Sequence, residues 1–472
     1  MAFLVAGTLR VATQMADTRD SLGRKGKYDV RGPKAALMLI SPGVVAAAVT
    51  ALEDVFQALG FESWERRQVP VQGFLEKLAG FRERLDAHRR PVGCALVALV
   101  APRGQLRQPQ QLVRELSGCR ALRGCPKVFL LLSSGPGSAP ESGAFLAGLR
   151  ELCGRSPHWS LVQLLTELLR KVTEESTGGT CCPVLRSSLR GALCLGGVEP
   201  WRPELAPGPN TQYDLSKTRA ALLLAVIQGR PGAQHDVEAL GGLCRALGFE
   251  TTVRMDPTAQ AFREELAQFQ KQLDTCRGPV SCVLVALMAH GGPQGQLLGA
   301  DGQEVQPEAL MQELSCCRVL WGRPKVFLLQ ACRGDVLQMY AEAQGPLGNG
   351  NFFPCWSLKR TLESASSNSF SEVTAGSSCR GAPPGRSDQA DILTVYSAAE
   401  GYVAYRDDKG SDFIQTLVEV LRANPGRDLL ELLTEVNRRV CEQDVLGPDC
   451  DELRKACLEI RSSLRHRLCL QP

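Results

Sequence analysis

The stretch KVFLLQACRGD, residues 325–335, decides how this chain folds. Lys325 is followed by four apolar residues, which is typical of a buried strand, and the strand then gives way to small and charged residues around Cys332. Cys332 is therefore either a buried core thiol or a nucleophile at the end of a strand. A second stretch, KVFLLLSSGPG at 127–137, repeats the apolar run but has Ser134 in place of the cysteine. The chain contains the pattern twice, and only one copy has the thiol.

The repetition extends along both halves of the chain. ALEDVFQALGFES at 51–63 returns as ALGGLCRALGFET at 239–251, and LRSSLRGALCL at 185–195 returns as IRSSLRHRLCL at 460–470. Because the matches keep their order, they indicate a tandem duplication of one domain. A stretch rich in proline and glycine at 196–212 indicates the linker between the two copies.

Within each copy, short apolar runs alternate with amphipathic segments. RAALLLAVI at 219–227 and CVLVALMA at 282–289 are typical of buried strands, and HDVEALGGLCRALG at 235–248 has its apolar residues near a 3.6-residue period, which predicts a helix. The alternation predicts an α/β fold: tandem domains, each a largely parallel sheet with helices on both faces. In such sheets chemistry gathers beyond the carboxyl ends of strands, where His290 and Cys332 stand.

The composition excludes several classes of function. The 472 residues are 44% hydrophobic and 22% charged, and the net charge of +4 is spread along the chain, so we expect no nucleic-acid partner. The apolar runs are too short to cross a bilayer, so we expect no membrane partner, and the start MAFLVAGTLRVA lacks the features of a signal peptide. The 19 cysteines have neither disulfide-framework nor zinc-site spacing, so we expect no metal and a reducing compartment, the cytoplasm or also the nucleus.

The second copy contains the groups that thiol catalysis needs. MAHGG at 288–292 places His290 just after one strand, and Cys332 follows a strand that we expect to lie beside it. A thiol attacks as the thiolate, and a nearby imidazole can accept its proton and later protonate a leaving amine. Thiolate and imidazole suffice for this chemistry, so we expect no cofactor.

QACRG, together with a preceding strand that ends in HG, resembles the signature of the caspase family. The likeness continues through YSAAEGYVAYRDDKGSDFIQTL at 396–417 and covers residues 213–472. It implies a cysteine endopeptidase that cleaves after aspartate in apoptosis or differentiation, with Cys332 as the nucleophile and His290 as the general acid and base. The backbone N–H groups of Gly291 and Cys332 would form the oxyanion hole.

The resemblance also implies how substrate is held. The residues expected to grip the carboxylate of the P1 aspartate, in the S1 pocket, are Arg230, Gln330 and Arg406. The residues expected to form a strand edge for the peptide and to line the S2 pocket are Val403, Ala404 and Tyr405. Simple core packing is the alternative for Val403 and Tyr405.

The resemblance divides the chain into an N-terminal extension and two domains. The expected parts are an extension at 1–27, a degenerate caspase-like domain at 28–198, a linker at 199–212, a large-subunit region at 213–340, an intersubunit loop at 341–389 and a small-subunit region at 390–472. No aspartate occurs between Val336 and Ser387, so we expect maturation, if it takes place, to cut after Asp388 or to use a protease of other specificity.

The first copy has lost every position that carries chemistry in the second. Pro102 stands where the second copy has His290, Ser134 stands where it has Cys332, and nothing corresponds to YSAAEGYVAYRDD. Two interpretations remain open: a protease, or a weak or inactive binding partner that regulates other caspases. Since caspases join through their last strands, we expect the two copies to pair within one chain, or the chain to form a homodimer.

Overall fold

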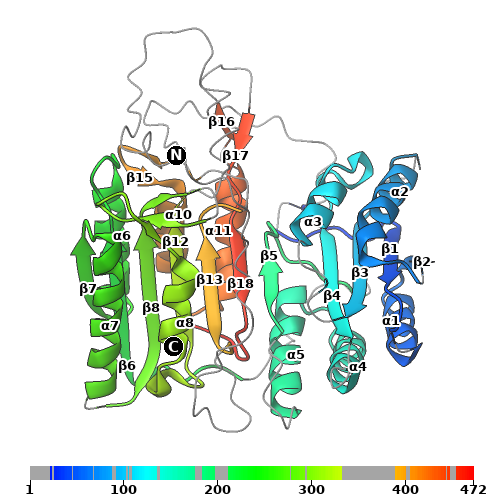
Figure 1. The fold of residues 1–472 in the computed structure, drawn as a ribbon, viewed down its shortest axis with the longest axis horizontal. Helices are drawn as coiled ribbons and strands as arrows, with labels where there is room; N and C mark the ends of the chain where they lie inside the picture. The colour runs from blue at the N-terminus through cyan, green and yellow to red at the C-terminus, as the bar shows by residue number, and fades with distance from the viewer. Residues whose placement is uncertain are drawn as a thin grey trace. The chain divides into compact units, whose positions relative to one another are not determined.

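The computed structural model divides into two compact units, which Figure 1 shows as ribbons. Unit 1 contains residues 183–188 and 211–471, and unit 2 contains residues 22–175 and 189–196, as far as each is described. The described residues are 22–23, 26–44, 46–66, 68–87, 92–102, 105, 109–134, 139–175, 183–196, 211–276, 278–292, 295–331, 389–399, 404, 406–442, 444–446 and 453–471.

Unit 1 is built on a seven-stranded sheet with the order β5-β18-β13-β12-β8-β6-β7. The strands are β5 (Leu185–Ser187), β18 (Glu459–Ser462), β13 (Ile392–Tyr396), β12 (Lys325–Gln330), β8 (Val280–Met288), β6 (Thr218–Ala225) and β7 (Glu250–Met255). The strands from β13 to β7 are parallel, whereas β18 is antiparallel to β13, and β5 is antiparallel to β18. The prediction of a largely parallel sheet is confirmed.

Helices cover both faces of this sheet because its strands are apolar on both sides (Figure 1). The helices of unit 1 are α6 (Ala233–Ala246), α7 (Ala259–Thr275), α8 (Pro307–Ser315), α10 (Asp412–Ala423), α11 (Leu429–Glu442) and the 3₁₀ turn η3 (Arg318–Leu320). Phe262 of α7 and Leu310 of α8 belong to one core cluster with Val285 of β8. Helix α10 packs against both α6 and α11.

Three short sheets stand apart from the main sheet of unit 1. They are formed by β9 (His290–Gly291), β10 (Leu297–Leu298) and β11 (Glu304–Val305); by β14 (Arg406–Asp407) and β15 (Gly410–Ser411); and by β16 (Asp444–Leu446) and β17 (Leu453–Lys455). Two of them contain residues that the sequence singles out for catalysis or substrate binding, His290 and Arg406.

Unit 2 contains a four-stranded parallel sheet with the order β2-β1-β3-β4. Its strands are β1 (Lys34–Ile40), β2 (Glu62–Arg66), β3 (Cys94–Pro102) and β4 (Lys127–Ser134); its helices are α1 (Ala46–Ala58), α2 (Phe74–Ala87), α3 (Pro109–Ser117), α4 (Ala139–Arg155) and α5 (Leu161–Glu175), with the 3₁₀ turns η1 (Val71–Gly73) and η2 (Arg120–Leu122). The strand order is that of β7-β6-β8-β12 in unit 1. The assignment of unit 2 as a second caspase-like domain stays a prediction.

Two structural devices occur at equivalent positions in both units. Lys325 donates from Nζ to the carbonyl oxygens of Leu320 and Arg323, and Lys127 donates to the carbonyls of Leu122 and Cys125. Burial lowers the pKa of Lys325 to about 8. The carbonyls at the end of the 3₁₀ turn satisfy this buried ammonium group, so both lysines serve the fold.

The second device closes the start of the first strand in each unit. Arg219 donates from Nη1 to the carbonyls of Leu247 and Leu470, at 2.8 and 2.7 Å. Lys34 makes the same two contacts in unit 2, with the carbonyls of Leu59 and Leu195. The repeated sequence therefore folds into repeated local structure.

The segment Cys182–Ser188 clusters with unit 1, although the sequence alignment places it at the end of the first copy. The other domain limits stay predictions. Among the described residues, no helix is long and apolar enough to span a membrane. The described part of the chain also has no group of three metal-ligating side chains.

Candidate active site

His290 lies beyond the carboxyl end of β8, beside the end of β12. The parallel pairing of these strands sets Met288 opposite Gln330, and the N–H of Ala289 donates to the carbonyl of Gln330 at 3.2 Å. His290 itself belongs to β9 and pairs with Leu298 of β10. The histidine is thus fixed by two sheets at the sheet edge where the sequence predicts chemistry. Cys332 lies outside the described residues, which end there at Ala331.

The backbone that leads to Cys332 is held by Ser397, which follows β13. Ser397 donates from its hydroxyl to the carbonyl of Ala331 and accepts a hydrogen bond from the N–H of Ala331, both at 3.1 Å. The N–H of Ser397 donates to the carbonyl of Leu329 at 2.9 Å. Both residues are buried, so these bonds fix the last described residue before the predicted nucleophile.

Arg230 is positioned by a tight loop between β6 and α6. Oδ1 of Asp256 accepts hydrogen bonds from the N–H groups of Ile227 and Gln228, at 2.7 and 3.0 Å. Gly229 has a φ of 66°, which favours glycine. A Cβ atom at Gly229 would lie 4.0 Å from Nε2 of His290, so this loop passes close to the imidazole.

Arg230 and Gln330 meet at the same edge of the sheet. Arg230 is 4% exposed; it donates from Nη1 to the carbonyl of Val226 at 2.6 Å and from Nη2 to the carbonyl of Gln330 at 3.4 Å. The side chain of Gln330 is buried, and its Oε1 has no hydrogen-bond partner among the residues that the structure describes. Burying an amide oxygen without a hydrogen-bond partner costs folding free energy, and such groups call for an explanation, for example a role in ligand binding.

Arg406 comes from the hairpin of β14 and β15, where it pairs with Ser411. Its side chain is 1% exposed. Oδ1 of Asp236, on α6, accepts hydrogen bonds from the N–H of Ser411 at 2.8 Å and from Nε2 of Gln415 at 3.0 Å, so it anchors the hairpin to the body of unit 1. Burial raises the pKa of Asp236, and the hydrogen bonds from Ser411 and Gln415 and the charge of Arg406 offset only part of this rise.

Burial and two nearby cationic side chains act on the imidazole of His290. Burial, followed by the charges of Arg230 and Arg406, lowers the pKa of His290 to about 4. The imidazole is therefore neutral near pH 7, which is the form that accepts a proton from a thiol. The same two guanidinium groups offer a buried anion two strong, planar donors.

The other predicted residues are only partly covered by the structure. Gly291 is buried in β9 opposite Leu297. Ala404 is 4% exposed and lies outside the described strands. Val403, Tyr405 and Asp388, like Cys332, are outside the described residues. Their predicted roles in substrate binding, processing and catalysis stay predictions.

Three polar residues that position this edge were not predicted from the sequence: Asp236, Asp256 and Ser397. Each accepts or donates side-chain hydrogen bonds to a loop or hairpin that carries a predicted site residue. Asp256 has a φ of 51°, and this left-handed turn after β7 has a weak sequence signal, MDP. The other two have no local pattern.

Unit 2 continues the equivalent strand ladder by two more residues. β3 and β4 stay in register to their ends, where Ala101 pairs with Ser133 and Pro102 with Ser134. The residues aligned with His290 and Cys332 are therefore direct neighbours across a parallel ladder. Neither an imidazole nor a thiol stands at these positions.

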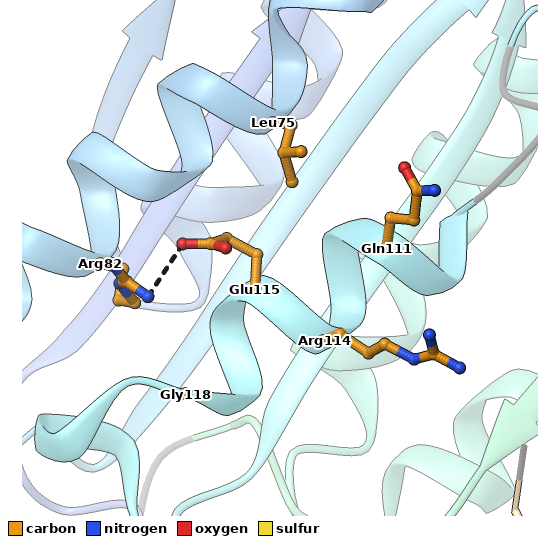
Figure 2. A pocket seen from close by; sticks show the side chains of 6 residues that line it. All are labelled: Leu75, Arg82, Gln111, Arg114, Glu115 and Gly118. Atoms are coloured by element: carbon orange, nitrogen blue, oxygen red, sulfur yellow. Dashed lines mark ion pairs between the residues drawn. The ribbon is translucent and has the colours of Figure 1, made fainter. Parts of the chain in front are cut away.

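A groove in unit 2 lies between helices α2 and α3 (Figure 2). It is lined by Leu75, Arg82, Gln111, Arg114, Glu115 and Gly118. An ion pair joins Nη1 of Arg82 to Oε1 of Glu115 at 3.1 Å. The lining contains no nucleophile and no imidazole, so the groove is not a candidate active site.

Comparison with known proteins points to one family. A family model described as "Caspase domain" matches residues 218–468. Caspase-14 of Homo sapiens is 41% identical over 263 residues, which cover 55% of this chain and 96% of caspase-14. The caspase B of Caenorhabditis elegans, whose name includes the word inactive, is 30% identical over 234 residues, covering 48% of this chain and 81% of that protein. The crystal structure of Caspase-1 from Spodoptera frugiperda matches with 24% identity and a TM-score of 0.41, covering 56% of this chain and 95% of that one.

Proposed function

Because the chain belongs to the caspase family, we propose that it is a cysteine endopeptidase that cleaves peptide bonds after aspartate. Cys332 is the proposed nucleophile and His290 the proposed general acid and base. The observation that carries the proposal is that buried Arg230 and Gln330 are joined by a hydrogen bond at the strand ends beside His290, whose imidazole lies against the loop of Gly229.

The proposed reaction passes through a thioester. His290 accepts the proton of the Cys332 thiol, and the sulfur attacks the carbonyl carbon of the P1 residue. The N–H groups of Gly291 and Cys332 are the proposed donors to the oxyanion that develops, a contribution on the order of 3 kcal/mol in such sites. The C–N bond breaks as His290 protonates the leaving amine. Water then attacks the thioester and gives a proton to His290. The C–S bond breaks, the acid is released, and His290 returns the proton to the sulfur of Cys332.

The strand register of unit 2 supports the proposed geometry. Pro102 and Ser134, which align with His290 and Cys332, pair directly at the ends of β3 and β4. Neighbouring parallel strands lie about 4.8 Å apart, a separation that lets side chains at paired positions reach each other. In unit 1 the ladder of β8 and β12 ends two residues earlier, at Met288 and Gln330, and the proposed path of the chain beyond Gln330 keeps the thiol within reach of the imidazole.

The proposed P1 preference follows from charge. Arg230, Gln330 and Arg406 are buried and would hold an aspartate carboxylate by charge-assisted hydrogen bonds. An uncharged side chain would forgo the charge-assisted bonds that an aspartate makes with both guanidinium groups, which strongly disfavours it. The backbone around Ala404 is the proposed edge that takes up the peptide, with Val403 and Tyr405 lining the S2 pocket.

Covalent labelling tests the proposal directly. The full chain is incubated with a biotinylated peptide whose P1 aspartate carries an electrophilic ketone, and labelling is measured beside the Cys332→Ala variant. We expect stoichiometric labelling that the variant loses. A probe with asparagine at P1 is the matched control, because it keeps the shape and lacks the charge. Labelling that survives Cys332→Ala, or equal labelling by both probes, contradicts the proposal.

The alternative function is that of a weak or inactive partner that regulates other caspases. Two observations support this alternative. One relative has the word inactive in its name, and the first copy of the repeat lacks the histidine and the cysteine. An unlabelled but folded chain that still binds other caspases would favour this alternative. The proposed enzyme works either as a homodimer or with its two copies paired in one chain. The proposed compartment is a reducing one such as the cytoplasm: twelve of the thirteen described cysteines are present as thiols, whereas Cys316 is disulfide-bonded.

A further inference from the structure

The edge of the seven-stranded sheet is covered by a strand that comes from the first copy of the repeat. β5 pairs antiparallel with β18, with Leu185 opposite Ser462, Arg186 opposite Arg461 and Ser187 opposite Ile460. Without β5, the strand β18 would present a row of unpaired N–H and C=O groups, and such an edge readily binds another strand.

The register of this pairing is symmetric with respect to the repeat. In the alignment of LRSSLR with IRSSLR, Arg186 corresponds to Arg461, so the central pair joins two equivalent residues. Leu185 faces the equivalent of Ser187, and Ser187 faces the equivalent of Leu185. This exchange is the signature of a two-fold axis, here an approximate one that passes between Arg186 and Arg461.

A buried side chain fixes the segment beyond β5. Asn437 of α11 is fully buried, and its Nδ2 donates to the carbonyl of Ser188 at 2.9 Å. Its Oδ1 accepts from the N–H of Leu458, just before β18, at 2.8 Å. Asn437 therefore forms hydrogen bonds both with the segment that contains β5 and with the residue just before β18, and these two bonds fix the register of the two strands.

Caspases join through their last strands, which here is the edge of β18, and we propose that residues 183–188 occupy this edge as an internal substitute for β18 of a second copy of this chain. A second copy fits the edge in the same register, since only the exchange of Leu185 for its isomer Ile460 separates the two sequences over the paired residues. The intact chain is then monomeric, and displacing residues 183–188 opens the edge to a second copy.

Residues 183–188 compete better for the edge of β18 than a second copy does, because they belong to the same chain. Residues 189–210 join it to Thr211, which belongs to the same unit as β18. Tethering of this kind raises the effective concentration to about the millimolar range, so a second copy at micromolar concentration does not compete. The pairing is nevertheless short, three residues and one side-chain bond, and each net hydrogen bond contributes only about 1 kcal/mol. The segment is therefore displaceable.

Disulfide trapping tests the internal pairing. Arg186→Cys and Arg461→Cys are combined in the full chain carrying Cys332→Ala, so the result does not depend on protease activity. Directly opposed residues have Cα atoms roughly 5 Å apart, which a disulfide can bridge. We expect mild oxidation to give a disulfide within one chain, identified as a cross-linked peptide by mass spectrometry. The control, Arg186→Cys with Glu459→Cys, is out of register by two residues and should remain largely uncrosslinked.

A proline in β5 tests the opened edge. Arg186→Pro disrupts the ladder at its centre, and Val184→Pro is the matched control because Val184 precedes β5 and is exposed. In sedimentation we expect the intact chain and the control to have the mass of one chain, and Arg186→Pro to form a dimer of twice that mass. Adding Arg461→Cys should link that dimer covalently, since only a residue on the two-fold axis faces itself.

Three outcomes would overturn the proposal. The first is a disulfide that joins position 186 of one chain to position 461 of another in the double cysteine variant, which would place a second chain's segment at the edge. The second is a dimeric intact chain. The third is an Arg186→Pro chain that stays folded and monomeric at every concentration. Circular dichroism of each variant establishes that it is folded before its mass is interpreted.

Discussion

The hydroxyl of Ser397 bonds to both backbone groups of Ala331, its N–H and its carbonyl, at 3.1 Å each. One side chain thus provides a hydrogen-bond partner for both backbone polar groups of the residue that follows β12, one residue before the proposed nucleophile. Positioning of this kind matters in catalysis, because small displacements of a reacting group lower the rate strongly.

Replacing Ser397 by alanine should slow acylation. Ser397→Ala leaves two buried backbone groups without their partner and frees the end of β12, so we expect kcat to fall about tenfold with little change in KM. Ser281→Ala is the matched control: Ser281 is equally buried and donates to the carbonyls of Lys217 and Thr218, at the opposite end of β8. Equal losses of activity in the two variants would show that Ser397 has only a structural role.

Removing a charge beside His290 should raise its pKa. Burial and the charges of Arg230 and Arg406 hold this pKa at about 4, so Arg230→Gln should raise it, whereas Arg230→Lys keeps the charge and should leave it low. NMR titration of the imidazole in the Cys332→Ala chain measures the change. The sign for stability also follows: the unfolded chain binds more protons between pH 6.5 and 4, so this contribution to stability is lost as the pH falls through that range. An unchanged pKa of His290 in the Arg230→Gln variant would contradict the proposed geometry.

Catalysis should depend on the thiol and the imidazole as one coupled pair. The pH dependence of kcat/KM should follow a bell with two macroscopic pKa values. A bound P1 carboxylate offsets the charges of the arginines and raises the pKa of His290, so the acidic limb of kcat should lie at higher pH than that of kcat/KM. His290→Ala and Cys332→Ala should each abolish turnover, and the double variant should be no worse. Clear additivity would exclude a shared catalytic unit.

Maturation after Asp388 should be slow, because the residues that follow it are held in the fold. Ala390 and Asp391 are buried, and Arg465 binds the carboxylate of Asp391 through Nε at 2.9 Å and Nη2 at 2.6 Å. The hydroxyl of Tyr213 donates to the same carboxylate at 2.6 Å. A protease needs an extended segment on both sides of the bond, so we expect Arg465→Gln to accelerate the cut.

Terminal sequencing of the processed chain checks this expectation. The small fragment should begin at Gln389, and Arg467→Gln is the control because the charge of Arg467 acts on Asp428 instead. A caspase cut between Val336 and Ser387, where no aspartate occurs, would show that the expected specificity is wrong.

Most of the framework of the site could be predicted from the sequence. The apolar runs before His290 and Cys332 predict buried parallel strands, and β8 and β12 are indeed neighbours in one parallel sheet. Arg230 and Gln330 also come together, although Arg406, on a two-residue strand, has no periodic pattern to place it. Long segments with a strong hydrophobic period can be predicted from the sequence, whereas the geometry of a short hairpin depends on contacts with residues far away in the sequence.

The supporting polar residues could not be predicted for the same reason. Ser397 and Ala331 are separated by 66 positions, and Asp236 and Ser411 by 175. A serine or aspartate near a turn is compatible with many local hydrogen bonds, so its long-range partner appears only in the folded chain. The register of β5 against β18 likewise required the structure, and the expected pairing of the two copies, or of two chains, stays a prediction.

The pair of Pro102 and Ser134 has a practical consequence for screening. The strands of unit 2 keep their ladder to the last residue, and their tips carry Pro102 and Ser134 rather than a histidine and a cysteine. Tip residues contribute little to the buried core, so exchanging them hardly alters the free energy of unfolding. A thermal-shift assay would therefore rate a catalytically empty unit and a competent one alike. Ligand-free melting temperatures cannot sort chains of this kind by activity, and only probes that react with the thiol can.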